Sequence, residues 1–115
     1  VDTTVANLSV PSVHGGYREI ITWKGLNLEQ PLHPTDVCGN TTYSRDYLGK
    51  NCQLPALQIA DIIAILDVGA YGYAMSSHFL HRPRPAEVLI ENGTHRLIRR
   101  REDYSILWEN QVFER

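Results

Sequence analysis

Residues 87–101 read EVLIENGTHRLIRRR and carry the clearest local fold signal in this chain. Two runs that contain branched apolar residues flank the dipeptide Asn92-Gly93. Asn and Gly both tolerate the positive φ angles that a type I′ turn requires at its two central positions. Such a turn joins two antiparallel strands directly, so residues 87–101 are predicted to form a β-hairpin.

Short segments bounded by Gly and Pro lie outside this hairpin, and they favour strands over helices. Strands are predicted over residues 17–23 and at the start of 36–46, with a turn-rich surface connection over 24–36 between them. Residues 61–68, DIIAILDV, form a continuous apolar run typical of a strand buried on both faces. Acidic residues followed by apolar ones predict a short helix over 102–110.

Length and composition limit the folds and the classes of partner that this chain is expected to have. The chain has 115 residues, of which 43% are hydrophobic and 21% charged, and this suits one globular domain. We therefore expect residues 1–115 to form a single all-β domain, a β-sandwich or small Greek-key barrel with one or two short helices. A formal net charge of −2 gives no reason to expect nucleic acid or a membrane surface as a partner.

The cysteines and the apolar runs bear on the location of the protein. Cys38 and Cys52 are too few for a disulfide framework; a single bridge between them stays open, but two reduced thiols in a cytoplasmic protein are favoured. The two cysteines and the five scattered histidines are not clustered as the ligands of a metal site would be, so no metal site is predicted. The longest apolar run, around residues 59–70, is interrupted by Asp61 and Asp67 and is too short to cross a membrane.

Three sequence blocks carry the functional signal. The third and longest comprises Asp67-x-Gly69-Ala70-Tyr71, then AMSS at 74–77 and RPRPAEVL at 82–89. The first comprises Val1-Asp2 and the spaced residues Pro11, Gly15, Tyr17 and Ile20, and the second comprises GNTTYSRD at 39–46, Leu48-Gly49 and Leu54-Pro55. Together these blocks resemble the C-terminal β domain of the pyridoxal-phosphate-dependent decarboxylases that include diaminopimelate and ornithine decarboxylase.

The resemblance implies that the chain is the C-terminal portion of a larger enzyme whose βα-barrel domain is absent from this chain. In that family the barrel holds most of the pyridoxal 5′-phosphate, and the β domain packs beside it. The implied activity of the full-length protein is decarboxylation of an amino acid, a lyase reaction, in a cytoplasmic homodimer that shares its site between subunits. The present chain alone is expected to be inactive.

Tyr71, in the Gly-Ala-Tyr motif of the third block, matches the tyrosine that in this family donates its hydroxyl to the cofactor phosphate. A phenol suits this task because it offers one directed donor without adding a charge. Gly69 is expected to leave room for approaching barrel loops. The alternative is that Tyr71 is an ordinary core or interface aromatic residue.

The second block departs from the family at two positions. Thr42 stands where the family has a cysteine near the reacting carbon, and Tyr43 stands where it has an acid that binds the distal ammonium. Asp46 keeps the final aspartate, so the resemblance makes Thr42 and Asp46 candidate catalytic residues and Tyr43 a substrate contact. Thr42 lacks the acidity of a thiol, but its hydroxyl is able to hold a water that delivers the proton. Cys38, four residues upstream, is expected to be a buried structural thiol.

The first block departs from the diaminopimelate decarboxylases, which have an arginine just before the proline and a tyrosine three residues after it. Here these positions are Val10 and His14. The loss of a bidentate carboxylate anchor argues against diaminopimelate itself as the substrate and favours a larger or modified amino acid. Asp2 and His14 are candidate substrate contacts, although Asp2 equally suits a turn and His14 the start of a strand.

Two other functions fit the same residues. In a non-catalytic homologue that regulates a partner, replacements such as Thr42 and Tyr43 at the family's cysteine and acid positions would be expected. The retained Tyr71 argues instead for a bound cofactor. A stand-alone β-sandwich binding module would explain a chain without a barrel, but it gives no reason for the Gly-Ala-Tyr and Arg-Pro motifs.

Overall fold

The computed structural model describes residues 1–26 and 29–114, and short strands dominate its regular structure. The elements in chain order are β1 (Ile20–Thr22), η1 (Trp23–Leu26), β2 (His33–Cys38), β3 (Tyr47–Leu54), β4 (Ile63–Ile65), η2 (Tyr73–Met75), β5 (Glu87–Glu91), β6 (Thr94–Arg99) and η3 (Tyr104–Leu107). The η elements are single 3₁₀ turns. The predicted all-β class is confirmed.

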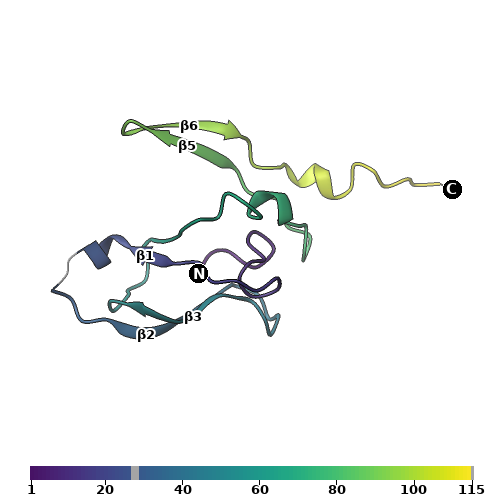
Figure 1. Cartoon of the computed structure of the whole chain (residues 1–115). Helices are drawn as coiled ribbons and strands as arrows, with labels where there is room; N and C mark the ends of the chain where they lie inside the picture. The colour runs from purple at the N-terminus through teal and green to yellow at the C-terminus, as the bar shows by residue number, and fades with distance from the viewer. Residues whose placement is uncertain (27–28, 115) are drawn as a thin grey trace.

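The strands pair in three antiparallel two-stranded sheets, β1–β4, β2–β3 and β5–β6. In Figure 1 the N-terminal segment, β1, β2 and β3 form one body, while the β5–β6 hairpin stands apart from it and the C-terminal tail extends away. The chain is accordingly elongated, with principal extents of 65 × 38 × 26 Å. A closed sandwich or barrel that would join these sheets stays a prediction.

The hydrophobic core lies where the N-terminal segment meets the β1–β4 and β2–β3 sheets. Its buried members are Leu8, Ile20, Val37, Leu48 and Leu54. Leu48 is fully buried because β3 runs through the centre of this cluster. Burial of these side chains is the main favourable free-energy term available to so small a body.

The predicted hairpin is confirmed, and its turn has the expected geometry. Asn92 and Gly93 have φ angles of 49° and 73°, and Glu91 pairs with Thr94 across the turn. Tyr73 of η2 lies between two guanidinium groups, with Arg84 4.2 Å and Arg99 of β6 4.1 Å from its ring centroid. These cation–π contacts fasten the hairpin to the preceding segment.

Two predicted strands are shorter than expected. The strand over residues 17–23 is limited to β1, and the run over 61–68 forms only β4, whose residues are half-buried or exposed. The expectation that this run is buried on both faces is wrong, because Ile63 and Ile65 pack against the core while Ala64 on the opposite face is exposed. Residues in the left-handed region lie just outside it, Ala60 with φ 76° and Asp67 with φ 55°, and they bound the extended segment.

The segments around β2 and β3 also differ from expectation. β2 begins at His33, inside the predicted connection 24–36, of which residues 27–28 lie outside the described part of the chain. β3 was not predicted. The expectation that Cys38 is a buried thiol is wrong, because alternation along β2 turns Val37 into the core and leaves Cys38 exposed.

The C-terminal helix expected over residues 102–110 is present as the single turn η3. Asp103 precedes this turn and caps it, since its carboxylate accepts a hydrogen bond of 2.9 Å from the Ser105 amide. Among the described residues, no helix has the length and apolar character needed to cross a bilayer.

Candidate functional site

The carboxylate of Asp46 ties the N-terminal segment to the loop 39–46, which joins β2 to β3. It accepts hydrogen bonds from the Thr4 hydroxyl at 3.0 Å and the Val5 amide at 2.9 Å. The amide of Thr41 at 3.1 Å and the Thr41 hydroxyl complete the set. Asp46 is 5% exposed, so this charge is held inside the protein by donors that converge on it.

Burial pushes the pKa of Asp46 upward, but the hydrogen bonds from Thr41, Val5 and Thr4 outweigh it and lower the pKa below its usual value. Gly39 makes room for the carboxylate, because a Cβ there would lie 2.1 Å from Asp46 Oδ1. Asp46 therefore fixes the shape of the loop, and its predicted catalytic part stays a prediction.

Thr42 and Tyr43 are both exposed at the tip of this loop. The Tyr43 ring meets Phe79 edge to face, with centroids 5.5 Å apart and an interplanar angle of 79°. Arg82 Nη1 also donates to Asn40 Oδ1 at 2.5 Å. The loop is thus braced against residues 77–82 while it presents Thr42 outward.

Two other predicted site residues, His14 and Tyr71, share one cavity of about 310 Å³. The cavity is lined by Val10, His14, Gly15, Gly16, Arg18, Tyr71 and Met75. The Tyr71 side chain is 63% exposed, and within residues 1–26 and 29–114 its hydroxyl has no hydrogen-bond partner. A Cβ at Gly72 would lie 1.9 Å from the Val68 carbonyl oxygen, so glycine is required in the tight turn that presents Tyr71.

The polar side chains around this cavity are all able to donate hydrogen bonds, His14 in one of its two tautomers. His14 Nδ1 is 2.8 Å from the hydroxyl of the buried Ser9, which orients the ring and leaves Nε2 for another partner. Arg18 Nη1 donates to the Tyr17 carbonyl at 2.9 Å, whereas Arg18 Nε is buried and has no partner among the described residues. None of the described lining residues is acidic, so the donor set fits a phosphoryl group or a carboxylate.

Sequence reasoning missed Arg18. The only signal in the sequence is a cation directly after Tyr17 of the first block, and charge alone does not distinguish a ligand from a solvated side chain.

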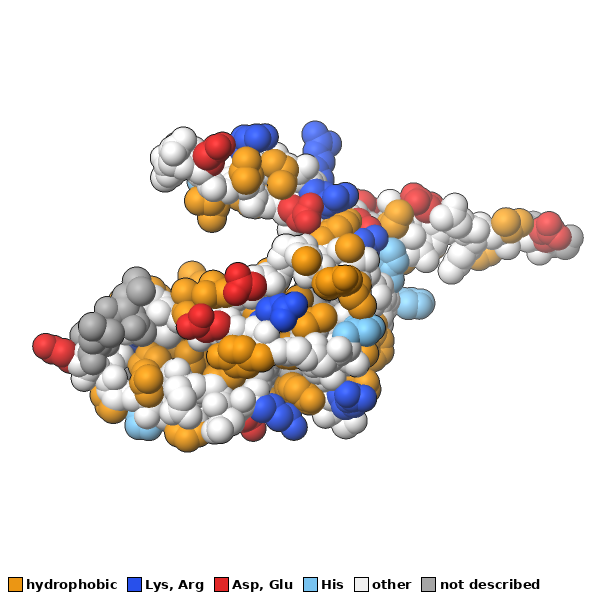
Figure 2. All heavy atoms as spheres, viewed as in Figure 1, with side chains coloured by type: hydrophobic (Ala, Val, Ile, Leu, Met, Phe, Trp, Pro, Cys, Tyr) orange, Lys and Arg blue, Asp and Glu red, His pale blue; other side chains and the backbone are white. Residues whose placement is uncertain are grey.

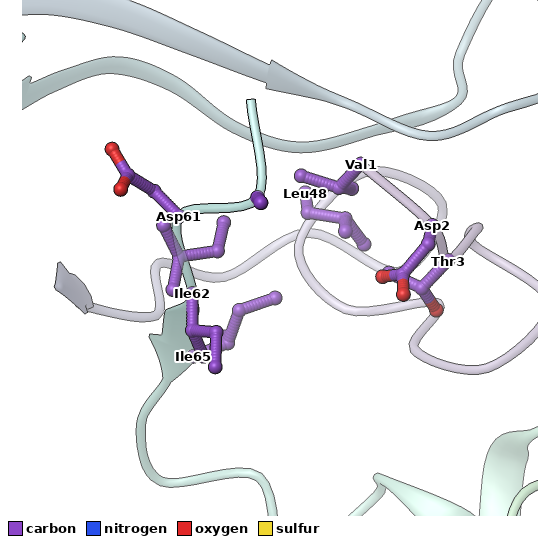
Figure 3. A pocket seen from close by; sticks show the side chains of 9 residues that line it. Val1, Asp2, Thr3, Leu48, Asp61, Ile62 and Ile65 are labelled. Carbon is purple, nitrogen blue, oxygen red and sulfur yellow. The ribbon is translucent and has the colours of Figure 1, made fainter. Parts of the chain in front are cut away.

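Asp2 lies in a different place, a cavity of about 600 Å³ that Figure 3 shows from close by. Asp2 and Thr3 line one side of it, and Asp61, Ile62 and Ile65 line the other. Lys24 Nζ lies 2.7 Å from the Asp61 carboxylate, and this hydrogen bond, with one from the Gln58 amide, lowers the pKa of Asp61. The structure therefore separates Asp2 from His14 and Tyr71.

Large hydrophobic side chains are exposed on two surfaces, which Figure 2 shows over the body and along the hairpin. On the β1–β4 side, Ile21, Trp23 and Ile62 surround an apolar cavity of about 400 Å³. On the hairpin, Val88, Ile90, Leu97 and Ile98 are all exposed. Apolar surface on this scale is typical of a region that packs against another protein surface.

Comparisons with known proteins agree on one family. A family model described as the C-terminal sheet domain of pyridoxal-dependent decarboxylases matches residues 1–69. The chain is 38% identical over 111 residues to the diaminopimelate decarboxylase of Methanothermobacter thermautotrophicus and 38% identical over 109 residues to that of Aquifex aeolicus. These matches cover 96% and 95% of the chain but 26% of each relative, so the chain spans about a quarter of their length.

Solved structures give the same result. A crystal structure of a protein from Aquifex aeolicus has a TM-score of 0.84 at 38% identity, covering 94% of this chain and 26% of that one. Diaminopimelate decarboxylase from Helicobacter pylori in complex with L-lysine has a TM-score of 0.82 at 34% identity, covering 95% of this chain and 26% of that one. Among the described residues, no three His, Cys, Asp or Glu side chains are grouped to hold a metal ion.

Proposed function

Because this chain belongs to the C-terminal sheet-domain family of the pyridoxal-dependent decarboxylases, we propose that it is the C-terminal domain of an amino-acid decarboxylase that uses pyridoxal 5′-phosphate. The observation that carries this is the cavity lined by Tyr71, Arg18 and His14, in which the Tyr71 hydroxyl has no partner and no lining residue is acidic among the described residues. An anionic group such as a phosphoryl finds only donors there.

Tyr71 donates its phenol hydrogen to the phosphoryl group of the cofactor. The tight turn at Gly72 fixes the direction of the side chain, and Met75 packs beside it as an apolar wall of the same cavity. Bound pyridoxal phosphate supplies the electron sink that makes loss of carbon dioxide feasible. The chain itself binds and orients the reacting groups.

A barrel domain of the same protein covers the exposed hydrophobic side chains of the β1–β4 side and the hairpin in this proposal. The number, size and exposure of these side chains support this covering: Trp23, for example, is 65% exposed and Ile62 is 74% exposed. The length of the relatives, about four times that of the matched part, is in keeping with such a domain.

The loop 39–46 serves the site of a second subunit in a cytoplasmic homodimer. Thr42 and Tyr43 are exposed and do not line the Tyr71 cavity, which suits residues that act across an interface. The Thr42 hydroxyl holds a water that gives its proton to the reacting carbon, and Tyr43 contacts the distal end of the substrate. Asp46 keeps both in place through its hydrogen bonds to Thr4, Val5 and Thr41.

The substrate is an amino acid whose distal end lies near His14. Asp2 lines a separate cavity, so a contact from Asp2 would reach a substrate bound elsewhere than beside His14 of the same chain. Val10 provides no carboxylate anchor, which favoured a substrate other than diaminopimelate, whereas the relatives at 38% identity are named diaminopimelate decarboxylases. Both substrate classes therefore belong in the test.

The test is to express the full-length protein, measure the absorbance of bound pyridoxal phosphate, and measure carbon dioxide release from a panel of amino acids. The panel includes meso-diaminopimelate, L-ornithine, L-lysine and larger conjugated amino acids. We expect cofactor binding and turnover of at least one member. Cofactor binding without any turnover would contradict the proposed decarboxylase activity. It would favour a non-catalytic regulatory homologue, which is consistent with Thr42 and Tyr43 at the two altered family positions.

A further inference from the structure

Building on the function proposed above, we propose that Arg18 is the principal ligand of an oxyanion in the cavity it shares with His14 and Tyr71. The oxyanion is either the phosphoryl group of the cofactor or a distal carboxylate of the substrate. In the second case Arg18 determines the preference of the enzyme for a substrate with a negatively charged end.

The guanidinium of Arg18 has hydrogen-bonding capacity that the protein leaves unused. Its Nη1 donates to the exposed carbonyl of Tyr17, and no ion pair among the described residues involves Arg18. Its Nε is shielded from solvent and has no acceptor in the described part of the chain. Because Nε is shielded, an anion that enters the cavity is received by the Nη groups, and Nη2 makes no hydrogen bond with the described residues that would compete for it.

The other lining groups favour the same kind of ligand. His14 is oriented by Ser9 so that its second ring nitrogen is available, and the Tyr71 hydroxyl has no partner among the described residues. Val10 and Met75 add apolar walls. Donors beside apolar walls hold an anion more strongly than the same donors in open water, because the local dielectric constant is lower.

Gly16 lies beside both the guanidinium of Arg18 and the side chain of Val10. A Cβ on this residue would lie 3.4 Å from Val10 Cγ1 and 3.6 Å from Arg18 Nη1, so both side chains lie close to its bare backbone. Arg18 therefore brings its charge next to position 10, where Val10 itself offers only an apolar surface. Gly16 has φ 95°, a conformation that disfavours any side chain there.

The direct test titrates inorganic phosphate and pimelate, a dicarboxylate, into the cofactor-free full-length protein by calorimetry. The variants are Arg18→Met, which keeps the apolar stem but removes the charge, and Arg100→Met as a control. Arg100 is exposed and has no hydrogen bond or ion pair among the described residues. We expect at least one anion to bind wild type, about tenfold weaker binding by R18M, and a change within about twofold for R100M.

Two further measurements identify the source of the oxyanion. A rise in the dissociation constant of pyridoxal phosphate for R18M assigns Arg18 to the phosphoryl group. A rise in KM for meso-diaminopimelate but not for L-ornithine assigns it to a substrate carboxylate. Either result supports the inference, and both readouts together would mean that the site spans the two groups.

A purely structural arginine predicts something different. Because Arg18 Nε is already unsatisfied, R18M should leave the thermal midpoint in anion-free buffer unchanged or higher. Unaltered anion binding by R18M, or no binding of either anion by wild type up to about 10 mM, would overturn the inference. Anion binding that depends on Arg18 in a protein that binds no cofactor would instead refute only the proposed function.

Discussion

Replacing Asp46 by Asn should release the N-terminal segment from the loop 39–46. The carboxylate accepts four hydrogen bonds, and each bond to a charged acceptor contributes about 1.5–3 kcal/mol. Asn keeps one acceptor oxygen, but its NH₂ group replaces the second oxygen. The donors that were bound to that second oxygen therefore lose their acceptor. The equivalent of one or two bonds is lost, so we expect a destabilisation of about 3 kcal/mol, or roughly a hundredfold in the local opening equilibrium.

Hydrogen exchange measures this opening at the amides of Val5 and Thr41, which donate directly to the carboxylate. Asp36→Asn is the matched control, because the exposed Asp36 accepts a single hydrogen bond from the Asn51 amide. Exchange at Val5 and Thr41 in D46N that equals wild type would refute the structural part assigned to Asp46.

The pH dependence of stability provides an independent check on Asp46. Its pKa is lowered in the folded protein, so the stabilisation is complete above the unfolded-state pKa of about 4 and is lost as pH falls through the folded value. The difference in unfolding free energy between wild type and D46N should therefore be constant from about pH 5 to 8 and shrink below about pH 4. Urea denaturation across this range measures it.

Three further changes test other contacts. Gly39→Ala places a methyl group against the Asp46 carboxylate and should cost about 2–4 kcal/mol of stability, seen as a lower urea midpoint; an unchanged midpoint would contradict the tight packing. Tyr71→Phe should weaken pyridoxal phosphate binding by about tenfold with little change in the thermal midpoint, because the side chain is exposed; equal affinity would remove Tyr71 from the phosphate site. Tyr73→Leu loses the contacts to Arg84 and Arg99 and should speed proteolytic cleavage of the hairpin by several-fold, whereas unaltered cleavage would mean that other contacts hold it.

Local turn chemistry made the hairpin predictable, since Asn92-Gly93 specifies its own backbone geometry. β3 was missed because its residues lack a regular alternation: Gly49 and Lys50 interrupt the pattern, and Asn51 has φ 55°. The strand predicted over residues 61–68 was too long, because an apolar run indicates burial but does not say which part of the protein packs against it. One face of this run, with Ile63 and Ile65, packs against the core, whereas Ile62 and Ala64 on the other face are exposed.

The candidate site was predictable only in part. Matching of short motifs brought out His14 and Tyr71, and the structure places these residues around one cavity. Arg18 and Cys38 could not be assigned correctly, for a common reason. Arg18 is notable because its Nε has no acceptor among the described residues. Cys38 is exposed because its side chain points away from the core on β2. Residue type alone predicts neither property.

The attachment of the first residues of the chain to the loop 39–46 has a mechanical consequence. Besides the bonds to Asp46, the Val1 nitrogen donates to the Cys38 carbonyl and the Asn40 amide donates to the Thr3 carbonyl. These hydrogen bonds join residues 1–5 to a loop about forty positions later in the chain. A displacement of the first residues would therefore act on Thr42 and Tyr43 at the loop tip through the buried residues Thr4, Val5 and Asp46.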